Sequence, residues 1–216
     1  MSNTNDSKVV FRQADLDQTG SLIITYEAMN PVEIKRGGQG LVIQYGFGQT
    51  PLGEVLVGWT SRGVCHFAFL SFHHDQMVAE LKAYWPHAIY IQDDQAAMQM
   101  LNTIFTLMRL SEPQGEQGKI HLLLKGTHFQ INVWKALIDI DLGQVVSYKQ
   151  LALQAGYPRA ARAVGSALAA NRIGFLIPCH RVIRENGETG HYRWGDARKK
   201  ALLTWEAMQR LYDTSG

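Results

Sequence analysis

The chain has 216 residues, of which 46% are hydrophobic and 19% charged, and its formal net charge is +2. These values are typical of one or two globular domains and exclude a disordered, fibrous or low-complexity protein. The sequence has no run of 18 apolar residues and no apolar segment behind a basic start, so we expect neither a membrane span nor a signal peptide. Two cysteines are too few for a disulfide framework or a four-cysteine zinc site, and a cytoplasmic protein with reduced thiols is expected.

The charge is unevenly distributed between the two halves of the chain. Residues 1–115 hold 7 Lys and Arg against 11 Asp and Glu, whereas residues 116–216 hold 14 against 8. Such asymmetry indicates a polyanionic partner for the second half. A solvated basic face would explain the same counts.

The first half predicts a small α/β domain behind a linker. Residues 1–40 are polar, contain Asn30-Pro31 and Gly37-Gly38, and are interpreted as a tail or linker with some helix. Alternating apolar residues predict three successive strands, at 41–47, 53–59 and 64–70. Apolar residues at helical spacing predict helices over 75–85 and 94–110. With a last strand at 120–124, we expect an N-terminal domain over 41–125 that contains an antiparallel sheet.

The second half, 126–212, predicts a mostly helical domain. Thr127 can cap a first helix, and Ser147 begins a second because Gln150, three residues on, completes a capping box. That helix ends at Gly156, and Pro158 is expected in the first turn of the next helix, which runs to about residue 171. Two short helices joined in this way form a helix-turn-helix pattern.

The second helix of this pair carries an unusual surface. Its outward positions are mostly Ala and Gly, with Arg159 and Arg162 as the long side chains. A helix with so few long polar side chains can approach a phosphate backbone closely but reads little base sequence. The alternative is that the alanines only pack against a neighbouring helix.

Pro178-Cys179-His180 is the segment with catalytic potential. A thiolate is a strong nucleophile, and a neighbouring imidazole can activate it if a third group orients the ring. Glu206, in an otherwise apolar helix face, is the candidate for that third group. Taken alone the motif is weak, because a buried cysteine often serves as a small hydrophobic residue.

A longer pattern of residues is far more specific. In order and spacing it resembles the O6-alkylguanine-DNA alkyltransferases (methylated-DNA–protein-cysteine methyltransferases), and within them the carboxy-terminal module of Ada-type proteins. The resemblance covers about residues 41–212, including Tyr45–Glu54 and Arg62–Cys65 in the first half. In the second half it is carried by Tyr148, Leu151-Ala152, Arg162–Gly165, Asn171, Ile177–Ile183, Gly190, Tyr192–Gly195 and Leu202–Glu206.

The resemblance implies a two-domain α/β fold. It pairs an N-terminal ribonuclease H-like domain with a C-terminal helical domain that has a winged-helix-like helix-turn-helix. It also implies DNA repair without a cofactor or metal, by a monomer that binds double-stranded DNA in the minor groove with little sequence specificity. The methyl group of O6-methylguanine, and of O4-methylthymine, would pass from a flipped-out base irreversibly to Cys179 in a single turnover.

The site residues follow from the same resemblance. The catalytic group would be Cys179, His180, Glu206, Asn171 and Tyr148. The DNA-binding group would be Tyr148, Arg162 as the residue that fills the gap in the base stack, and the small residues Ala160, Ala161, Ala163 and Gly165. The substrate pocket would include Pro178, Tyr192 and Arg193.

Three alternatives come from other classes. An alkyltransferase-like protein binds lesions without reacting, but such proteins lack the cysteine that is present here as Cys179. A transcriptional regulator could use the same helix pair, against which the alanine-rich face argues. A Cys-His hydrolase usually has its cysteine and histidine far apart in sequence, whereas here they are adjacent.

Overall fold

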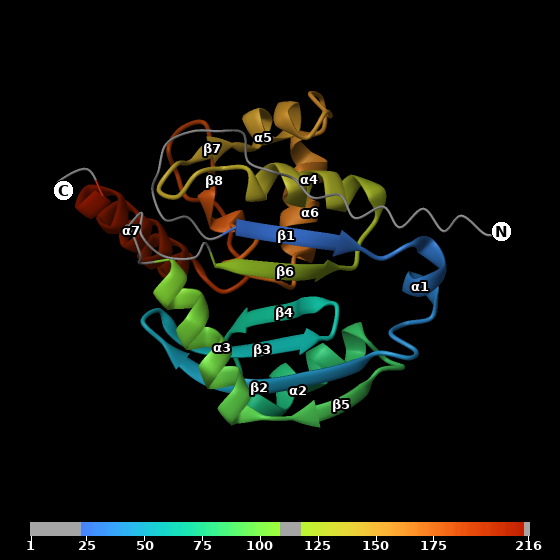
Figure 1. Cartoon of the computed structure of the whole chain (residues 1–216). Helices are drawn as coiled ribbons and strands as arrows, with labels where there is room; N and C mark the ends of the chain where they lie inside the picture. The colour runs from blue at the N-terminus through green and yellow to red at the C-terminus, as the bar shows by residue number, and fades with distance from the viewer. Residues whose placement is uncertain (1–22, 109–117, 214–216) are drawn as a thin grey trace.

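A computed structural model describes residues 23–108 and 118–213 and shows a six-stranded sheet with a helical half along one edge (Figure 1). The strand order is β1-β6-β4-β3-β2-β5. The strands span Ile23–Ala28 (β1), Val42–Thr50 (β2), Gly53–Thr60 (β3), Gly63–Phe69 (β4), Ile89–Gln92 (β5) and Lys119–Leu124 (β6). Strands β1 and β6 therefore lie on the side of the sheet that faces the helical half.

The sheet is mixed, so the expectation of an antiparallel sheet was wrong in part. β2, β3 and β4 pair antiparallel as a meander, as the three alternating segments predicted. The pairs β1–β6, β2–β5 and β4–β6 are parallel. Parallel partners are joined by crossovers and not by hairpins, so no local turn signal in the sequence announces them.

Residues 1–40 were expected to be a tail or linker with some helix, and the structure differs because this segment also contributes a strand to the sheet. Residues 23–28 form β1, which pairs with β6 along its full length, and Pro31–Lys35 form the short helix α1. Asn30 caps α1 and Glu33 completes a capping box. Residues 1–22 lie outside the described part of the chain.

Two helices accompany the sheet, α2 (His74–Tyr84) and α3 (Asp94–Leu107). Helix α3 packs closely against β2 because β2 carries glycine at two contact positions. A Cβ atom at Gly46 would lie 2.8 Å from the Cβ of Ala97, and one at Gly48 would lie 2.7 Å from Cδ1 of Leu101. These glycines allow the helix to approach the strand backbone more closely than any side chain would permit.

The helical half consists of α4 (His128–Ile138), α5 (Tyr148–Gln154), α6 (Ala161–Ala170) and α7 (Asp196–Asp213). The predicted caps are confirmed: Thr127 and Ser147 both accept from the backbone of the first turn that follows them, and Gly156 has φ +85°. The predicted start of α6 at Pro158 was wrong. The Ala160 N–H closes a turn on the Tyr157 carbonyl, and the helix begins only after that turn.

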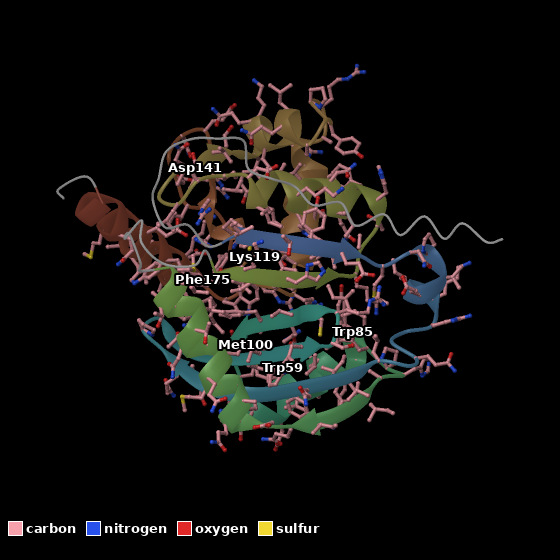
Figure 2. All side chains as sticks on the ribbon, in the orientation of Figure 1. Trp59, Trp85, Met100, Lys119, Asp141 and Phe175 are labelled. Carbon is pink, nitrogen blue, oxygen red and sulfur yellow. The ribbon has the colours of Figure 1, made fainter. Side chains whose placement is uncertain are left out.

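An aromatic cluster joins the two halves around Phe175, whose position is labelled in Figure 2. The Phe175 ring lies 4.8 Å from Phe105 of α3, 5.9 Å from Phe67 of β4 and 5.8 Å from Trp205 of α7, measured between centroids. Phe175 is buried, and its φ of +66° is rarely adopted by residues other than glycine. Such strain persists only where the surrounding packing over-determines the conformation.

Within residues 23–108 and 118–213, no helix combines the length and apolar character needed to cross a membrane.

Candidate active site

Cys179 lies in a tight turn between the two halves of the molecule. It is the first residue of a 3₁₀ helix (Cys179–Arg181), which begins after Pro178 and leads directly into β8 (Val182–Ile183). β8 pairs in parallel with β7 (Val146–Ser147), the short strand that precedes α5. The turn thus leads into a strand that pairs beside the start of α5, and only 4% of the Cys179 surface is exposed.

Asn171 holds this turn from the end of α6. Its side-chain Nδ2 donates to the Ile177 carbonyl at 3.1 Å and to the Cys179 Sγ at 3.4 Å, and its Oδ1 accepts from the Ile173 N–H at 2.8 Å. The side chain is buried. The end of α6 and the turn that carries Cys179 are therefore joined through one amide.

His180, the residue that follows Cys179, forms a buried pair with Glu206. The Nε2 of His180 lies 2.7 Å from Oε1 of Glu206, and both side chains are fully buried. A carboxylate only accepts, so the ring proton belongs on Nε2 and the Nδ1 atom is left as an acceptor. Nδ1 is buried and has no hydrogen-bond partner in the part of the chain that the structure describes.

Glu206 is held by more than the histidine. Arg181 donates to its two carboxylate oxygens through Nε, at 2.9 and 3.1 Å, and through Nη2, at 2.9 Å. The Gly143 N–H adds a bond of 3.1 Å. Burial raises the pKa of Glu206, but the hydrogen bonds and charges of His180 and Arg181 outweigh it and bring the pKa to about 2. The carboxylate is therefore ionised at neutral pH.

The resting thiol is protonated. Burial raises the pKa of the Cys179 thiol to about 11, against the opposing effects of the Asn171 hydrogen bond and the Lys199 charge. Burial also lowers the pKa of His180, although Glu206 counteracts this. His180 and Cys179 are therefore both neutral in the resting protein. A neutral imidazole can accept a proton, so this is the state that general-base activation requires.

Lys199 is a buried cation that the sequence analysis missed. Only 1% of its surface is exposed, and its Nζ donates to the carbonyls of Val182 and Thr189. Burial lowers its pKa, and the neighbouring Cys179 counteracts this. The spacing could have revealed it, because Lys199, Leu202 and Glu206 share one helix face at i, i+3 and i+7.

Tyr148, the first residue of α5, spans the space between α6 and the loop before α7. A Cβ at Gly165 would lie 3.8 Å from the Tyr148 ring, and one at Gly190 would lie 3.2 Å from its hydroxyl oxygen. Gly190 has φ +66°. The structure therefore brings the Tyr148 hydroxyl to the segment that also carries Tyr192.

The outer face of α6 carries small residues and one arginine. Arg162 and Ala163 are exposed, and Ala160, Ala161 and Gly165 are half-buried. The opposite face packs inward, where the Trp134 Nε1 donates to the Ala167 carbonyl at 2.9 Å. The alanines of the predicted DNA-binding group thus lie on the solvent side of the helix or at its margin.

The expected pocket residues occupy different environments. Pro178 and Tyr192 adjoin the thiol turn, and the Tyr192 ring meets His180 edge-on at 6.4 Å. Burial raises the pKa of the Tyr192 hydroxyl well above its usual value, and the nearby Cys179 adds to this. Arg193 instead forms an ion pair with Glu80 of α2 at 2.9 Å, which the sequence did not indicate.

Within the described ranges, no group of three or more His, Cys, Asp or Glu side chains is arranged to hold a metal ion.

Comparison with known proteins places this geometry in context. Residues 128–208 match the family model described as 6-O-methylguanine DNA methyltransferase, DNA binding domain. The chain is 35% identical to the bifunctional transcriptional activator/DNA repair enzyme Ada of Escherichia coli, over 94% of this chain and 53% of the relative. It is 54% identical to the methylated-DNA–protein-cysteine methyltransferase of Salmonella typhimurium, over 38% of this chain and 47% of the relative. The chain thus spans about half the length of the curated relatives it matches.

A solved structure matches more completely. The crystal structure of the Mycobacterium tuberculosis O6-methylguanine methyltransferase superimposes with a TM-score of 0.59 at 31% identity. The match covers 77% of this chain and 94% of that structure. Both the sheet-containing half and the helical half therefore have counterparts in one known two-domain protein.

Proposed function

The chain belongs to the O6-methylguanine-DNA methyltransferase family, and from this premise we propose that it repairs alkylated DNA by moving the alkyl group to Cys179. The substrate is O6-methylguanine in double-stranded DNA, with O4-methylthymine as a second substrate. The observation that carries the proposal is the buried thiol beside a His180–Glu206 pair whose free ring nitrogen is an acceptor.

The division of the chain is part of the proposal. A boundary near residue 125 separates the sheet from the helices, between the end of β6 at Leu124 and the cap of α4 at Thr127. The first domain is of the ribonuclease H-like type. The pairing of β7 with β8 beside α5 supports a winged-helix-like arrangement in the second.

DNA binds along α6, in the minor groove and with little sequence preference. The alanines on and beside the exposed face allow the helix to approach the sugar-phosphate walls, and they carry no groups that distinguish bases. The target base is inaccessible inside a duplex and must be extruded, at the cost of a few kcal/mol of lost stacking. Arg162, exposed on this face, fills the gap that the base leaves.

The reaction is an in-line displacement at the alkyl carbon. Through a bridging water, the thiol proton moves to Nδ1 of His180, and Glu206 stabilises the imidazolium that forms. The Cys179 sulfur then bonds to carbon as the bond between carbon and O6 breaks, and the electron pair passes to O6. Tyr148 donates a hydrogen bond to the leaving guanine, which takes up one proton from water and ends as neutral, unmodified guanine, while the His180 imidazolium releases its proton to water.

The product cannot be reversed by this site. A thioether has no acidic proton and offers a poor leaving group, so one chain removes one alkyl group and is then spent. The protein acts as a monomer, because each chain supplies its own nucleophile, base and DNA-binding helix.

Intact-mass measurement tests the proposal. We expect the protein to gain one methyl group, about 14 Da, when it is incubated with a duplex that contains one O6-methylguanine. The gain should be absent in Cys179→Ala and retained in Cys65→Ala, whose cysteine is buried in β4. Tight binding of the lesion duplex without any mass gain would refute alkyl transfer and indicate a non-catalytic lesion-binding protein.

A further inference from the structure

A single carboxylate of the N-terminal half contacts two arginines of the helical half. Glu80, on α2, accepts from Arg193 at 2.9 Å and from Arg172 at 3.4 Å. These contacts join residues that are 113 and 92 positions apart in the sequence. Arg172 also lies over the ring of Tyr84, one turn further along α2, at 5.5 Å. We refer to Glu80, Arg172 and Arg193 as the interdomain clasp.

Each arginine of the clasp adjoins a residue of the active site. Arg172 follows Asn171, whose amide donates to the Cys179 sulfur. Arg193 follows Tyr192, which packs edge-on against His180. A displacement of either arginine backbone would therefore be transmitted directly to a group that touches the nucleophile or its base.

The two attachments differ in how else they are secured. At Arg172 the main chain is fixed independently, because the Phe67 N–H of β4 donates to the Arg172 carbonyl at 2.9 Å and the Gly174 N–H donates to the Phe67 carbonyl at 2.8 Å. Arg193 lies in the irregular segment between β8 and α7. Its other side-chain bond is a long one, 3.4 Å, to the Ala169 carbonyl. Glu80 therefore has its greatest influence on the segment around Tyr192.

We propose that Glu80 is a positioning residue for alkyl transfer, acting through Arg193 to hold Tyr192 against His180 and Cys179. The inference rests on the proposed function of the site. Glu80 is 44% exposed on its side chain and each arginine about a quarter exposed, so the clasp contributes little to global stability. Its effect is local: without the carboxylate, the two guanidinium groups lose their shared counter-charge, and the Tyr192 segment loses its ion pair with α2.

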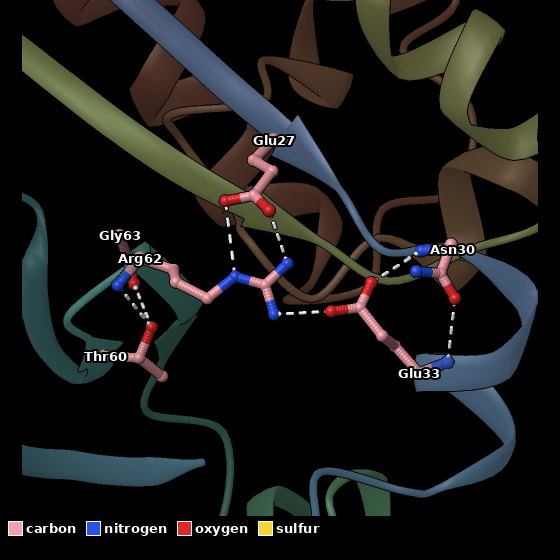
Figure 3. A network of polar contacts seen from close by, with 6 residues as sticks. All are labelled: Glu27, Asn30, Glu33, Thr60, Arg62 and Gly63. Atoms are coloured by element: carbon pink, nitrogen blue, oxygen red, sulfur yellow. Dashed lines mark hydrogen bonds and ion pairs between the residues drawn. The ribbon is translucent and has the colours of Figure 1, made fainter. Parts of the chain in front are cut away.

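The chain offers a control in another ion-pair network, which lies within the N-terminal half and in which one arginine lies between two glutamates (Figure 3). Arg62, in the β3–β4 turn, pairs with Glu27 of β1 and Glu33 of α1. Glu27 is 45% exposed on its side chain, nearly the same as Glu80. Both networks are ion pairs between distant segments, but Glu27 and Arg62 contact no residue of the active site in the described structure.

The experiment compares Glu80→Gln with Glu27→Gln in single-turnover methyl transfer, with duplex affinity measured separately. We expect Glu80→Gln to lower the transfer rate constant roughly tenfold, because small displacements of reacting groups slow a reaction strongly. The Kd for the duplex should stay within about twofold of wild type, and the unfolding midpoint within about 2 °C. Glu27→Gln should leave the rate unchanged. The charge-reversed pair Glu80→Arg with Arg193→Glu should recover most of the rate lost in Glu80→Arg alone.

The outcomes separate the two proposals. If wild type transfers the methyl group and Glu80→Gln does so equally fast, the clasp has no positioning role and the proposed function stands. Equal slowing in Glu27→Gln would also overturn it. If wild type transfers nothing, the proposed function fails. Amide hydrogen exchange then tests the interdomain clasp independently. Faster exchange around Tyr192 in Glu80→Gln, but not in Glu27→Gln, would support the clasp, and unchanged exchange would refute it.

Discussion

The Nε2 of His180 lies 2.7 Å from Oε1 of Glu206, and neither side chain has any exposed surface. This contact fixes which ring nitrogen carries the proton and leaves Nδ1 as a buried acceptor. Since Arg181 binds the same carboxylate, Glu206 must serve both the catalytic ring and a buried cation. Its removal should therefore affect both reactivity and stability.

Glu206→Gln should lower stability and slow transfer together. The amide leaves Arg181 buried without its counter-charge, which we expect to cost about 3 kcal/mol in the free energy of unfolding, measured in urea. The methyl-transfer rate should fall roughly 100-fold, since the imidazolium loses its stabilising charge. Glu188→Gln, which breaks the exposed pair with Arg184, is the control and should change neither value. A stable, fully active Glu206→Gln protein would contradict the assignment.

The same carboxylate predicts how stability depends on pH. The pKa of Glu206 is about 2 in the folded protein against an ordinary value of 4.5, so below pH 4.5 the unfolded chain binds a proton that the folded chain does not. The stability that Glu206 contributes is complete above pH 4.5 and is lost as the pH falls toward 2. Urea midpoints measured across this interval should fall less steeply in Glu206→Gln than in wild type. Parallel curves would show that the carboxylate is not stabilised as described.

Lys199 should lower the pKa of the Cys179 thiol through its charge. In Lys199→Met we expect the pKa of the thiol to rise further, and carbamidomethylation of Cys179 at a fixed pH of 8 to slow by roughly tenfold for each unit of that rise. Lys199→Arg keeps the charge and should react more like wild type. Peptide mass spectrometry distinguishes Cys179 from Cys65, whose pKa burial raises to about 12. An unchanged rate in Lys199→Met would mean that the ammonium acts only through its two carbonyl bonds.

Arg162→Ala should impair base extrusion and not chemistry. The side chain is exposed, so the unfolding midpoint should not change. Transfer from a duplex should slow by roughly 10- to 100-fold, because the cost of unstacking the base is no longer offset. With single-stranded DNA that carries the same lesion, the deficit should shrink to a few-fold. An equal deficit on both substrates would assign Arg162 to general DNA affinity instead.

Local sequence signals predicted much of the helical half. The capping box at Ser147 and Gln150 and the left-handed Gly156 are short-range features, and the structure contains both. The adjacency of Cys179 and His180 is likewise local, and the structure places both residues in a short 3₁₀ helix. Glu206 was found because a carboxylate stands out in an apolar helix face.

Contacts between segments far apart in the chain could not be predicted from the sequence. β1 is stabilised by β6, a parallel partner 96 residues away, and nothing in the segment Ile23–Ala28 identifies that partner. The short strand β5 likewise depends on its parallel pairing with β2. Glu80 looks like any charged residue on an exposed helix face, and only the fold brings it to Arg193. Pro158 led to the wrong predicted start of α6, because a proline suits a tight turn as well as the first turn of a helix.

A protein that reacts only once must keep its thiol unmodified until it binds an alkylated base. In the resting protein Cys179 is 4% exposed and burial raises its pKa to about 11, so the thiol is almost entirely protonated at neutral pH. Peroxides and stray electrophiles, which attack thiolates, find almost none to attack. Burial makes the deprotonation of Cys179 depend on His180, and it therefore also protects the thiol of an unreacted molecule from modification.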